Sequence, residues 1–400
     1  MKMIKGIKVM LVPNNKQRTT LFQYAGAKRF AYNWALARQQ ENYKNGGKFI
    51  SDNDLRKEFT QLKKLEEYQW LNSVSNNVTK QAIKDCCMAF KRFFKDQAKY
   101  PKFKSRKHDE PKFYQDNIKI QFTGTHVKFE GFTDSKKKNK QQINWVRLAE
   151  HERIPHDKNI KYINPRVSFD GLNWFVSVGV ECEDSLETPV NQGLGVDLGI
   201  KDLAICSDDN TYKTINKTKK VKQLKKRLKR QQRQVSRKYD NLKLDKVYKK
   251  GERPKKTKNI IKLERKINKT HKRLNGIRHN YLHQTTSEII NRKPMFVVLE
   301  DLNVSGMLKN KHLSKAIQEQ CFYEFYRQMQ YKCLWNNIEF IEADRFYASS
   351  KTCSECGAKN KKLQLSDREW ACSECGVVHD RDKNAAINLM KYGQSIVTAL

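Results

Sequence analysis

Several common features are missing from this 400-residue sequence. No run approaches the roughly 18 apolar residues that a membrane-spanning helix needs, and no signal peptide is present. The N-terminus, MKMIKGIKVMLVPNN, offers neither an amphipathic anchor nor a lipidation motif. We therefore expect no membrane partner, and a soluble protein that acts inside the cell.

Acidic residues are scarce relative to basic ones. The chain has 43 Asp and Glu against 81 Lys and Arg, which gives a formal net charge of +38. This charge far exceeds what solubility requires, so it predicts an extended polyanion as partner. Nucleic acid is the leading candidate. An anionic membrane surface is the alternative, and the absence of an anchor argues against it.

Cysteine is too infrequent for a disulfide scaffold, because ten residues are spread over a chain of this length. Four of them form a C-x2-C-x15-C-x2-C pattern, which is typical of two knuckles that hold one tetrahedral Zn²⁺. Four free thiols are the alternative, but both pairs would then show ligand spacing by accident. His379 is a possible substitute ligand. The four cysteines are Cys353, Cys356, Cys372 and Cys375.

The first half of the chain changes from helical to β-type patterns. KGIKVMLVPN alternates like a strand, residues 17–45 have helical spacing, and a second long helix is predicted around residues 83–94. KYPKFKSRK follows and combines aromatic with basic residues, as a nucleic-acid-binding loop would. From about residue 112 the segments alternate and are separated by Gly, Asp and Asn. This order predicts a small β-barrel interrupted by a helical insertion, followed by a linker, EDSLETPVNQG.

Residues 217–280 form the most basic segment, with 27 Lys and Arg against four Asp and Glu. Apolar positions keep helical spacing on both sides of GERPKK, which predicts a helical hairpin with one packed seam. A solvated charged helix pair is the alternative, but such faces usually mix both signs. The seam positions are Val221, Leu224, Leu228, Val235, Tyr239 and Leu242, then Leu263, Ile267, Leu274, Ile277 and Tyr281.

LGVDLGIKDLAI, residues 194–205, is an apolar strand that carries a carboxylate between two glycines. Strand alternation places Gly195, Asp197 and Gly199 on one face, which is bare apart from the carboxylate. Such a face would let a metal ion and a phosphate approach the backbone. The simpler alternative is an Asp at the mouth of a β-hairpin.

Two further segments place acidic residues at the ends of elements. KPMFVVLEDLNVSGM predicts a buried strand that ends on Glu300 and Asp301. HDRDKNAAINL places Asp380 and Asp382 just before a helix that we expect to begin near Asn384, where the helix dipole favours a negative charge. Each could be an N-cap or a metal ligand, and the residues alone do not decide between these roles.

Taken together, GVDLGIKDLA, VVLEDLNVSGM, SSKTCSECG and REWACSECGVVHDRDKNAAIN resemble the signature segments of the TnpB family, which are transposon-encoded, RNA-guided DNA nucleases related to type V CRISPR effectors. The resemblance is specific over residues 190–392. Before residue 190 it depends mainly on the order of the segments. The family usually has proline before SSKTC, where this chain has Ala348.

The resemblance implies a RuvC-like, RNase H-type core in which Asp197, Glu300 and Asp382 bind two Mg²⁺. Asp382 is preferred over Asp380 because the third carboxylate of the family lies two residues before the Asn, here Asn384. Two metal ions would serve the in-line attack of water on a phosphodiester.

The implied fold class is an α+β multidomain protein. It combines a wedge-like β-barrel with a helical insertion, an RNase H-like α/β core and an inserted zinc ribbon. The expected domains are the barrel at 1–18 and 108–188, the helical recognition domain at 19–107, the nuclease core at 190–346 and 380–400 with its basic hairpin at 217–290, and the ribbon at 347–379.

The resemblance also implies the activity and the partners. We expect an endonuclease that cuts double-stranded target DNA next to a short flanking motif, with a guide RNA derived from the transposon end. A cytoplasmic, nucleoid-associated location in a prokaryote would follow. The alternatives are a guided repressor that has lost cleavage and a transposition accessory protein that binds DNA without RNA. The basic hairpin does not separate RNA from DNA.

Overall fold

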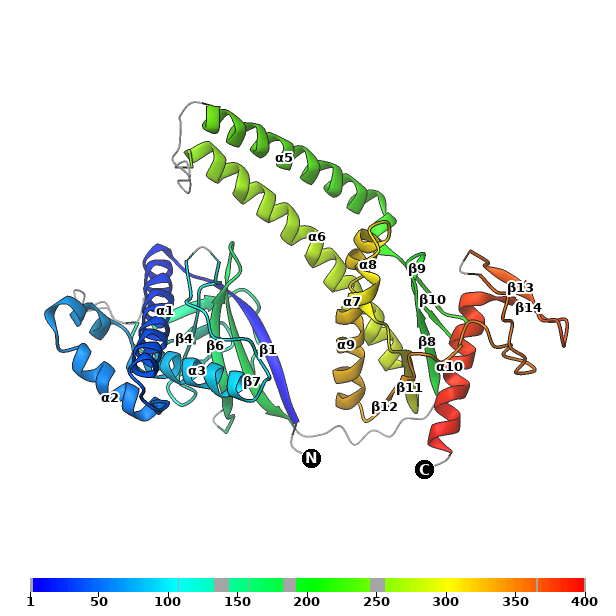
Figure 1. The fold of residues 1–400 in the computed structure, drawn as a ribbon, viewed down its shortest axis with the longest axis horizontal. Coiled ribbons are helices and arrows are strands. Elements are labelled where there is room, and N and C mark those ends of the chain that lie inside the picture. Colours follow the sequence, from blue (N-terminus) through cyan, green and yellow to red (C-terminus); the bar gives the residue numbers. More distant parts are fainter. Residues whose placement is uncertain are drawn as a thin grey trace. The chain divides into compact units, whose positions relative to one another are not determined.

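The computed structural model describes residues 3–106, 108–132, 144–157, 159–182, 192–244, 256–364 and 366–398. The chain divides into two compact units, Met1–Glu183 and Asp184–Leu400, which Figure 1 shows as ribbons. Most of the expected linker EDSLETPVNQG lies outside the described residues. Within the described segments, no helix combines the length and the apolar character needed to cross a membrane.

In the first unit, four helical segments lie in the sequence between the first and second strands, and the sequence pattern predicts the first and the last of them. A capping box formed by Asn14 and Gln17 starts the first helix, and Ser51 caps the second. The second and third segments were not predicted, because they are short and their apolar residues are few. The segments are α1 (Asn15–Lys44), α2 (Asp52–Leu62), η1 (Glu66–Ser73) and α3 (Asn76–Phe94).

The sheet of the first unit has seven strands in the order β2-β6-β7-β1-β5-β4-β3, and neighbouring strands are antiparallel. Among the described residues no backbone pairing joins the edge strands β2 and β3, so the structure establishes a sheet and not a closed barrel. The strands are β1 (Met3–Val12), β2 (Lys112–Tyr114), β3 (Gln121–Phe122), β4 (His126–Lys128), β5 (Trp145–Leu148), β6 (Tyr162–Phe169) and β7 (Trp174–Cys182).

One apolar core joins this sheet to its helices. Val9 and Val176 from the sheet share a buried cluster with Leu21 of α1 and Ile83 of α3. Within the β-type region expected from about residue 112, residues 117–122 form only the short strand β3, because the Asp116 carboxylate accepts hydrogen bonds from the backbone N–H groups of Ile118 and Lys119 and stabilises a turn there.

The second unit contains a five-stranded mixed sheet in the order β10-β9-β8-β11-β12. β8 pairs antiparallel with β9 and parallel with β11, and β11 pairs parallel with β12. The strands are β8 (Leu194–Leu198), β9 (Asp202–Cys206), β10 (Thr211–Lys213), β11 (Phe296–Glu300) and β12 (Glu339–Ala343).

Helices cover both faces of this sheet. Val297 and Leu299 point into a core shared with α6 and α9, whereas Phe296 and Val298 pack with Leu389 of α10 on the opposite face. This alternation explains why β11 is apolar throughout. The remaining elements are η2 (Ile215–Lys217), α5 (Lys219–Leu244), α6 (Lys258–Asn291), α7 (Val304–Met307), α8 (Ser314–Gln320), α9 (Phe322–Trp335), β13 (Glu369–Ala371), β14 (Val378–Asp380) and α10 (Arg381–Val397).

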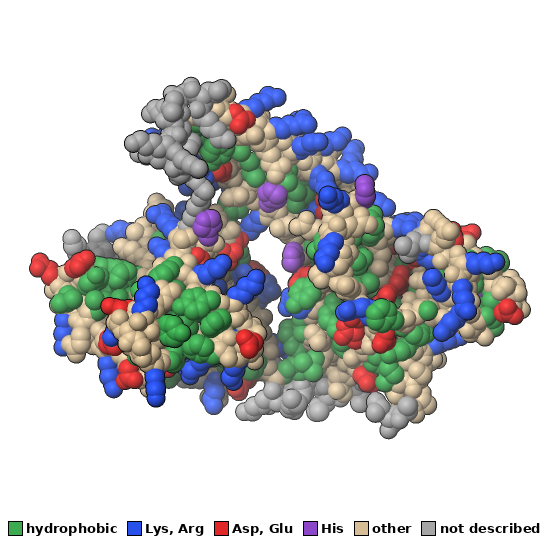
Figure 2. All heavy atoms as spheres, viewed as in Figure 1, with side chains coloured by type: hydrophobic (Ala, Val, Ile, Leu, Met, Phe, Trp, Pro, Cys, Tyr) green, Lys and Arg blue, Asp and Glu red, His purple; other side chains and the backbone are tan. Residues whose placement is uncertain are grey.

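The basic segment forms the expected helical hairpin, made of α5 and α6. Val221 and Leu224 of α5 pack against Leu274 of α6 in a buried seam. Figure 2 shows Lys and Arg side chains gathered along the outer side of α5. Residues 245–255, which include most of GERPKK, lie outside the described part of the chain.

Candidate active site and metal centre

Asp197 lies near the end of β8, on the face of the sheet that α10 covers. Gly195, two residues earlier on the same face, contacts this helix so closely that a Cβ would lie 2.0 Å from the Ala386 carbonyl oxygen and 2.4 Å from the Met390 nitrogen. The expectation that the bare face admits a metal ion and a phosphate is therefore wrong at Gly195. The glycine is required by helix packing, and this packing brings the start of α10 toward Asp197.

Asp380 and Asp382 have different roles at the start of α10. The helix begins at Arg381, three residues before the expected start, and Asp380 is its N-cap. Asp380 Oδ1 accepts hydrogen bonds from the backbone nitrogens of Asp382 (3.0 Å) and Lys383 (2.9 Å). Asp382 lies in the first turn, where the helix dipole favours its charge, and its carboxylate takes no part in the cap.

Glu300 joins the site through the register of two parallel strands. Leu299 of β11 lies beside Val196 of β8, so Glu300 and Asp197 follow at the same edge of the sheet. Burial raises the pKa of Glu300, and the neighbouring Asp301 adds to this effect. Among the described residues no ion pair involves Glu300 or Asp197, so neither carboxylate is neutralised by a neighbour.

The three acidic groups interact electrostatically. The pKa of Asp197 is raised to about 7, first by burial and then by the charges of Asp382 and Glu300. Like charges that raise a carboxyl pKa in this way would be stabilised by a bound cation. The structure therefore brings together the three residues that the sequence singled out, from β8, β11 and α10.

Two arginines hold the Asp382 carboxylate. One oxygen lies 2.8 Å from Arg381 Nη2 and 3.0 Å from its Nε, and the other lies 3.0 Å from Arg368 Nη1. The sequence patterns did not predict these contacts. Asp382 is thus coupled to Asp197 through space while its own hydrogen bonds go to cations of the protein.

The four cysteines form the one set of three or more metal-ligand side chains that converge within the described residues. Their sulfur atoms all lie within 4.8 Å of one another. The Cys353–Cys375 and Cys356–Cys372 sulfur separations are 3.7 and 3.6 Å. Tetrahedral coordination with bonds of about 2.3 Å requires sulfur separations of about 3.8 Å, so the cluster fits a Zn²⁺ ion.

Backbone geometry builds this cluster. Gly357 and Gly376 have φ values of 77° and 74°, and each donates its N–H to the carbonyl of the first cysteine of its pair. Only glycine adopts such angles without strain, which explains the glycine after each C-x2-C pair. Backbone N–H groups of Cys375 and Glu374 lower the pKa of Cys372 to about 7, which favours a thiolate.

His379 lies beside the cluster. Its Nε2 is 3.0 Å from the Cys353 sulfur, and its ring centroid lies 4.9 Å from that of Trp370. It does not belong to the converging ligand set, which the four cysteines complete. His379 is therefore placed to form a hydrogen bond with Cys353, which is one of the candidate metal ligands.

Two asparagines, not singled out as functional from the sequence, attach the cysteine ribbon to α10. Asn384 Oδ1 accepts from the Ser354 nitrogen at 2.9 Å, and Asn388 Nδ2 donates to the carbonyl oxygens of Ser349 (2.8 Å) and Thr352 (2.6 Å). Both asparagines are buried. Their i, i+4 spacing in KNAAIN was the available signal, because it places two amides on one helical face.

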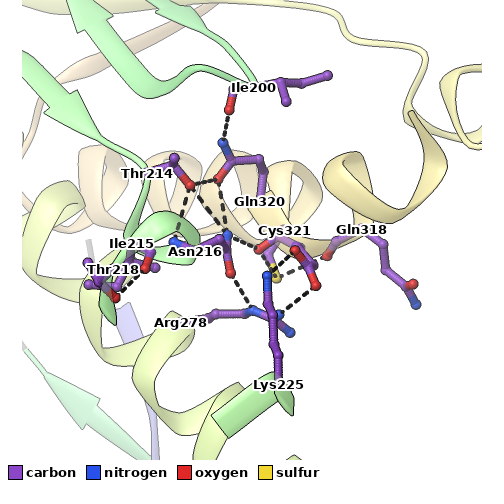
Figure 3. A network of polar contacts seen from close by, with 11 residues as sticks. Ile200, Thr214, Ile215, Asn216, Thr218, Lys225, Arg278, Gln318, Gln320 and Cys321 are labelled. Atoms are coloured by element: carbon purple, nitrogen blue, oxygen red, sulfur yellow. Dashed lines mark hydrogen bonds and ion pairs between the residues drawn. The ribbon is translucent and has the colours of Figure 1, made fainter. Parts of the chain in front are cut away.

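Gln320, at the end of α8, is a further residue that was not predicted from the sequence, and Figure 3 shows it within a network of polar contacts. Its Nε2 donates to the carbonyl oxygens of Gly199 (3.1 Å) and Ile200 (2.9 Å), which form the turn directly after the strand of Asp197. Its Oε1 accepts from Thr214 Oγ1 at 2.9 Å. A buried amide thus connects the turn after β8 to the segment that enters the basic hairpin.

The same network anchors the hairpin itself. Asn216 Nδ2 donates to the Glu319 carbonyl at 2.8 Å, and Arg278 Nε of α6 donates to Asn216 Oδ1 at 2.9 Å. The Glu319 carboxylate pairs with Lys225 of α5 and lies 3.3 Å from Arg278. Both helices of the hairpin are therefore bonded to α8.

Comparisons with known protein families give three matches along the chain. A family described as "Helix-turn-helix domain" matches residues 1–48, "Probable transposase" matches residues 177–311, and "Cas12f1-like, TNB domain" matches residues 322–389. The described residues of the first region fold as strand β1 and the single helix α1, so that name does not describe their structure.

Two relatives match over most of this chain and most of their own length. The chain is 30% identical to "Putative RNA-guided DNA endonuclease InsQ" of Escherichia coli, over 99% of this chain and 94% of that protein. It is 32% identical to "Putative RNA-guided DNA endonuclease" of Streptomyces pristinaespiralis, over 97% and 89%. A Cas12f1 chain from a complex with guide RNA and target DNA shares the fold, with a TM-score of 0.60 and 13% identity over 97% of this chain and 99% of that chain.

Proposed function

Because the chain belongs to the TnpB family of transposon-encoded proteins, we propose that it is an RNA-guided, metal-dependent DNA endonuclease. It would cut double-stranded DNA next to a short flanking motif, at a site that a guide RNA from the transposon end selects by base pairing. The observation that carries this proposal is the electrostatic interaction of Asp197 with Glu300 and Asp382, with Asp197 and Glu300 at the carboxyl ends of the paired strands β8 and β11.

The domain organisation we propose follows the fold. The mixed sheet with helices on both faces supports an RNase H-like nuclease core at 190–346 and 380–400, which includes the hairpin at 217–290. The cysteine cluster supports a zinc ribbon at 347–379 that contacts target nucleic acid. The seven-stranded sheet supports a wedge-like barrel at 1–18 and 108–188, and the helices between β1 and β2 support a recognition domain at 19–107.

In the proposed catalytic site, Asp197, Glu300 and Asp382 supply the hard oxygen ligands that Mg²⁺ prefers. A bound pair of Mg²⁺ ions supplies Lewis-acid activation of the attacking water and of the leaving oxygen. Asp197 must give up its proton before it can act as a ligand, because its pKa is raised to about 7. Asp382 must exchange contacts with Arg368 and Arg381 for a cation.

The cysteine cluster has a structural role in this proposal. Four thiolates from Cys353, Cys356, Cys372 and Cys375 would complete the shell of one Zn²⁺ and leave no open position for chemistry. Asn384 and Asn388 bond the ribbon to α10, so the ribbon helps to position the helix that carries Asp382.

The basic hairpin is the proposed grip on the guide RNA. A segment with +23 net charge over 64 residues repels itself unless phosphates neutralise it, and structured RNA presents phosphates densely. A nucleoid-associated location follows from the proposed DNA target.

The experiment that tests this function compares cleavage of one plasmid by the protein with a matched guide, with a scrambled guide and without RNA. We expect Mg²⁺-dependent cutting with the matched guide alone. Equal cutting in all three reactions would leave an unguided nuclease. Absence of cutting, with guided binding retained, would favour the second candidate, a guided repressor, for which the arginine-bound state of Asp382 is the supporting observation.

A further inference from the structure

The first unit contains a cationic cleft of about 490 Å³ that no proposed activity uses so far. It lies between α1, α3 and the segment that leads into β2. Three acidic residues also line it, Asp85, Asp109 and Glu110. The cationic lining residues are Lys28, Arg29, Arg92, Lys104, His108 and Lys112.

Lys28 is the most unusual of these residues, because its side chain is only 9% exposed. Within the described residues it has no ion pair and no hydrogen bond. Its Nζ lies 5.2 Å from the centroid of the Tyr32 ring, and Lys104 Nζ lies 5.4 Å from the same centroid. Two ammonium groups therefore share one aromatic ring.

The electrostatic environment disfavours the charge of Lys28. Burial lowers its pKa, and although Asp85 opposes this shift, the nearby cations Lys112, Lys104 and Arg166 add to it. A buried lysine without a direct ion pair costs folding free energy, so a ligand that supplied negative charge there would be stabilised.

Most of the acidic groups in the cleft already have partners. Asp85 lies 3.1 Å from Arg166, and the Asp109 carboxylate lies 3.4 Å from Lys104 Nζ and accepts from the Ser105 nitrogen at 2.7 Å. Glu110 has no hydrogen bond or ion pair with any residue that the structure describes, so its carboxylate is the one in the cleft whose charge is not offset by a partner. Four cations remain without an ion pair among the described residues, namely Lys28, Arg29, Arg92 and Lys112.

We propose that this cleft binds a backbone phosphate of nucleic acid, with Lys28 as the deep contact. The inference rests on the proposed function, in which nucleic acid is the partner. A phosphate would neutralise Lys28 and accept hydrogen bonds from the cations at the rim, and the cleft has room for the attached sugar. This chemistry is shared by RNA, DNA and free phosphate, so the three are tested separately.

The test uses the full-length protein and the Lys28→Met variant, which removes the charge but keeps the apolar stem. Affinity is measured against salt for the RNA that copurifies with the protein and for a 20-base-pair DNA duplex. The salt slope is the magnitude of the slope of log affinity against log salt concentration. For one of these ligands, we expect this slope to decrease by about 0.7 to 0.9, which corresponds to roughly five- to eightfold weaker binding at 0.1 M salt.

Two variants keep the test decisive. Lys57→Met is the matched control, because Lys57 lies on exposed α2 and already pairs with Asp54 at 3.3 Å, so its salt slope should not change. Lys112→Met changes an exposed rim residue, so it tests the cleft with little risk to folding, and it should decrease the slope in the same way.

The melting temperature of Lys28→Met distinguishes a role of Lys28 in binding from a role in folding. Lys28→Met should melt at the same temperature as the wild type or higher, because the buried charge is removed. Unchanged salt slopes for both nucleic acids, or a marked loss of stability without a slope change, would overturn the proposal. If inorganic phosphate raises the melting temperature of the wild type but not of the variant, while both slopes stay equal, the cleft binds a free anion and the nucleic-acid site is refuted.

Failure of this site is distinguishable from failure of the proposed function. If the wild-type protein cuts with a matched guide and the Lys28→Met slopes are unchanged, only the cleft proposal fails. If the wild type binds neither RNA nor DNA, the premise of a nucleic-acid partner fails first.

Discussion

The cysteine cluster and the acidic site both include or adjoin residues near the start of α10, and they differ in how complete they are. The four sulfur atoms already converge within 4.8 Å. The carboxylates of Asp197, Glu300 and Asp382 are coupled electrostatically but do not form a converging set, and Asp382 is held by arginines. One site is assembled by the local backbone, whereas under the proposed function a bound cation would draw the carboxylates of the other together.

The physical reason is the difference between thiols and carboxylates. Neutral thiols can approach one another at little cost, and the knuckle N–H groups stabilise the first thiolate. Ionised carboxylates repel one another, and this repulsion adds to the effect of burial, which is the main reason that the pKa of Asp197 is raised to about 7. We therefore expect the geometry of the acidic site to depend on the concentration of metal ions, and the geometry of the cysteine cluster to depend on folding of the ribbon.

The largest expected effect comes from the acidic ligands. Asp197→Ala, Glu300→Ala or Asp382→Ala should each reduce single-turnover cleavage by roughly a thousandfold or more, because a metal ligand is lost. Guide and target binding should stay close to wild type. Asp380→Ala is the matched control, and loss of its cap should cost only about 0.5–2 kcal/mol of stability. Normal cutting by Asp382→Ala, with inactive Asp380→Ala, would reverse our assignment of the third ligand.

The second effect concerns the cysteine cluster. Cys353→Ser or Cys375→Ser should remove bound zinc, unfold the ribbon and also reduce cleavage, because the ribbon is bonded to the helix of Asp382. Metal analysis, melting curves and cleavage rates measure the three consequences. Cys321→Ser, outside the cluster, is the control. Protein purified without chelators that contains no zinc would contradict this part of the comparison.

The third effect tests whether the turn after β8 helps to position Asp197. Gln320→Glu removes the two N–H donors to Gly199 and Ile200 and should slow single-turnover cleavage about tenfold or more. The Mg²⁺ concentration for half-maximal rate should rise, while RNA affinity stays constant. Gln318→Glu, an exposed residue of the same helix, is the control. A variant that loses stability but keeps the wild-type Mg²⁺ dependence would show that Gln320 is only structural.

The smallest expected effect concerns a buried lysine outside the acidic site, which we expect to affect stability but not cleavage. Lys332 of α9 is buried, donates to the His283 carbonyl and to Thr286 and Ser287, and has its pKa lowered to about 8 by burial. Between pH 8 and about 10.4, the unfolded chain binds more protons than the folded one at this group, so its contribution makes stability rise with pH.

Lys332→Met should remove this rise in melting experiments and leave cleavage at neutral pH within about twofold of wild type. A large loss of cleavage with normal folding would mean that perturbed groups outside the acidic site also take part in the reaction.

Much of the candidate site could be predicted from the sequence, because its signals are local. The C-x2-C pairs with their glycines specify knuckles, and the two apolar strands place Asp197 near the end of one strand and Glu300 at the end of the other. The hairpin seam was predictable for the same reason, since helical spacing survives a highly charged background. The second helical segment of the first unit was missed, because its short amphipathic stretch resembles a loop.

What the sequence alone determined is therefore the set of candidate ligands, their spacing along the chain and the net positive charge that favours a polyanionic partner. Only the tertiary structure decided that Gly195 serves the packing of α10, that Asp380 is the cap while Asp382 faces two arginines, and that Gln320 ties the turn after Asp197 to the hairpin. Apart from the Asp380 cap and the Arg381 contact, which are local, these contacts join residues distant in the chain. Periodicity and spacing report which face a residue occupies, but not which distant group lies opposite it.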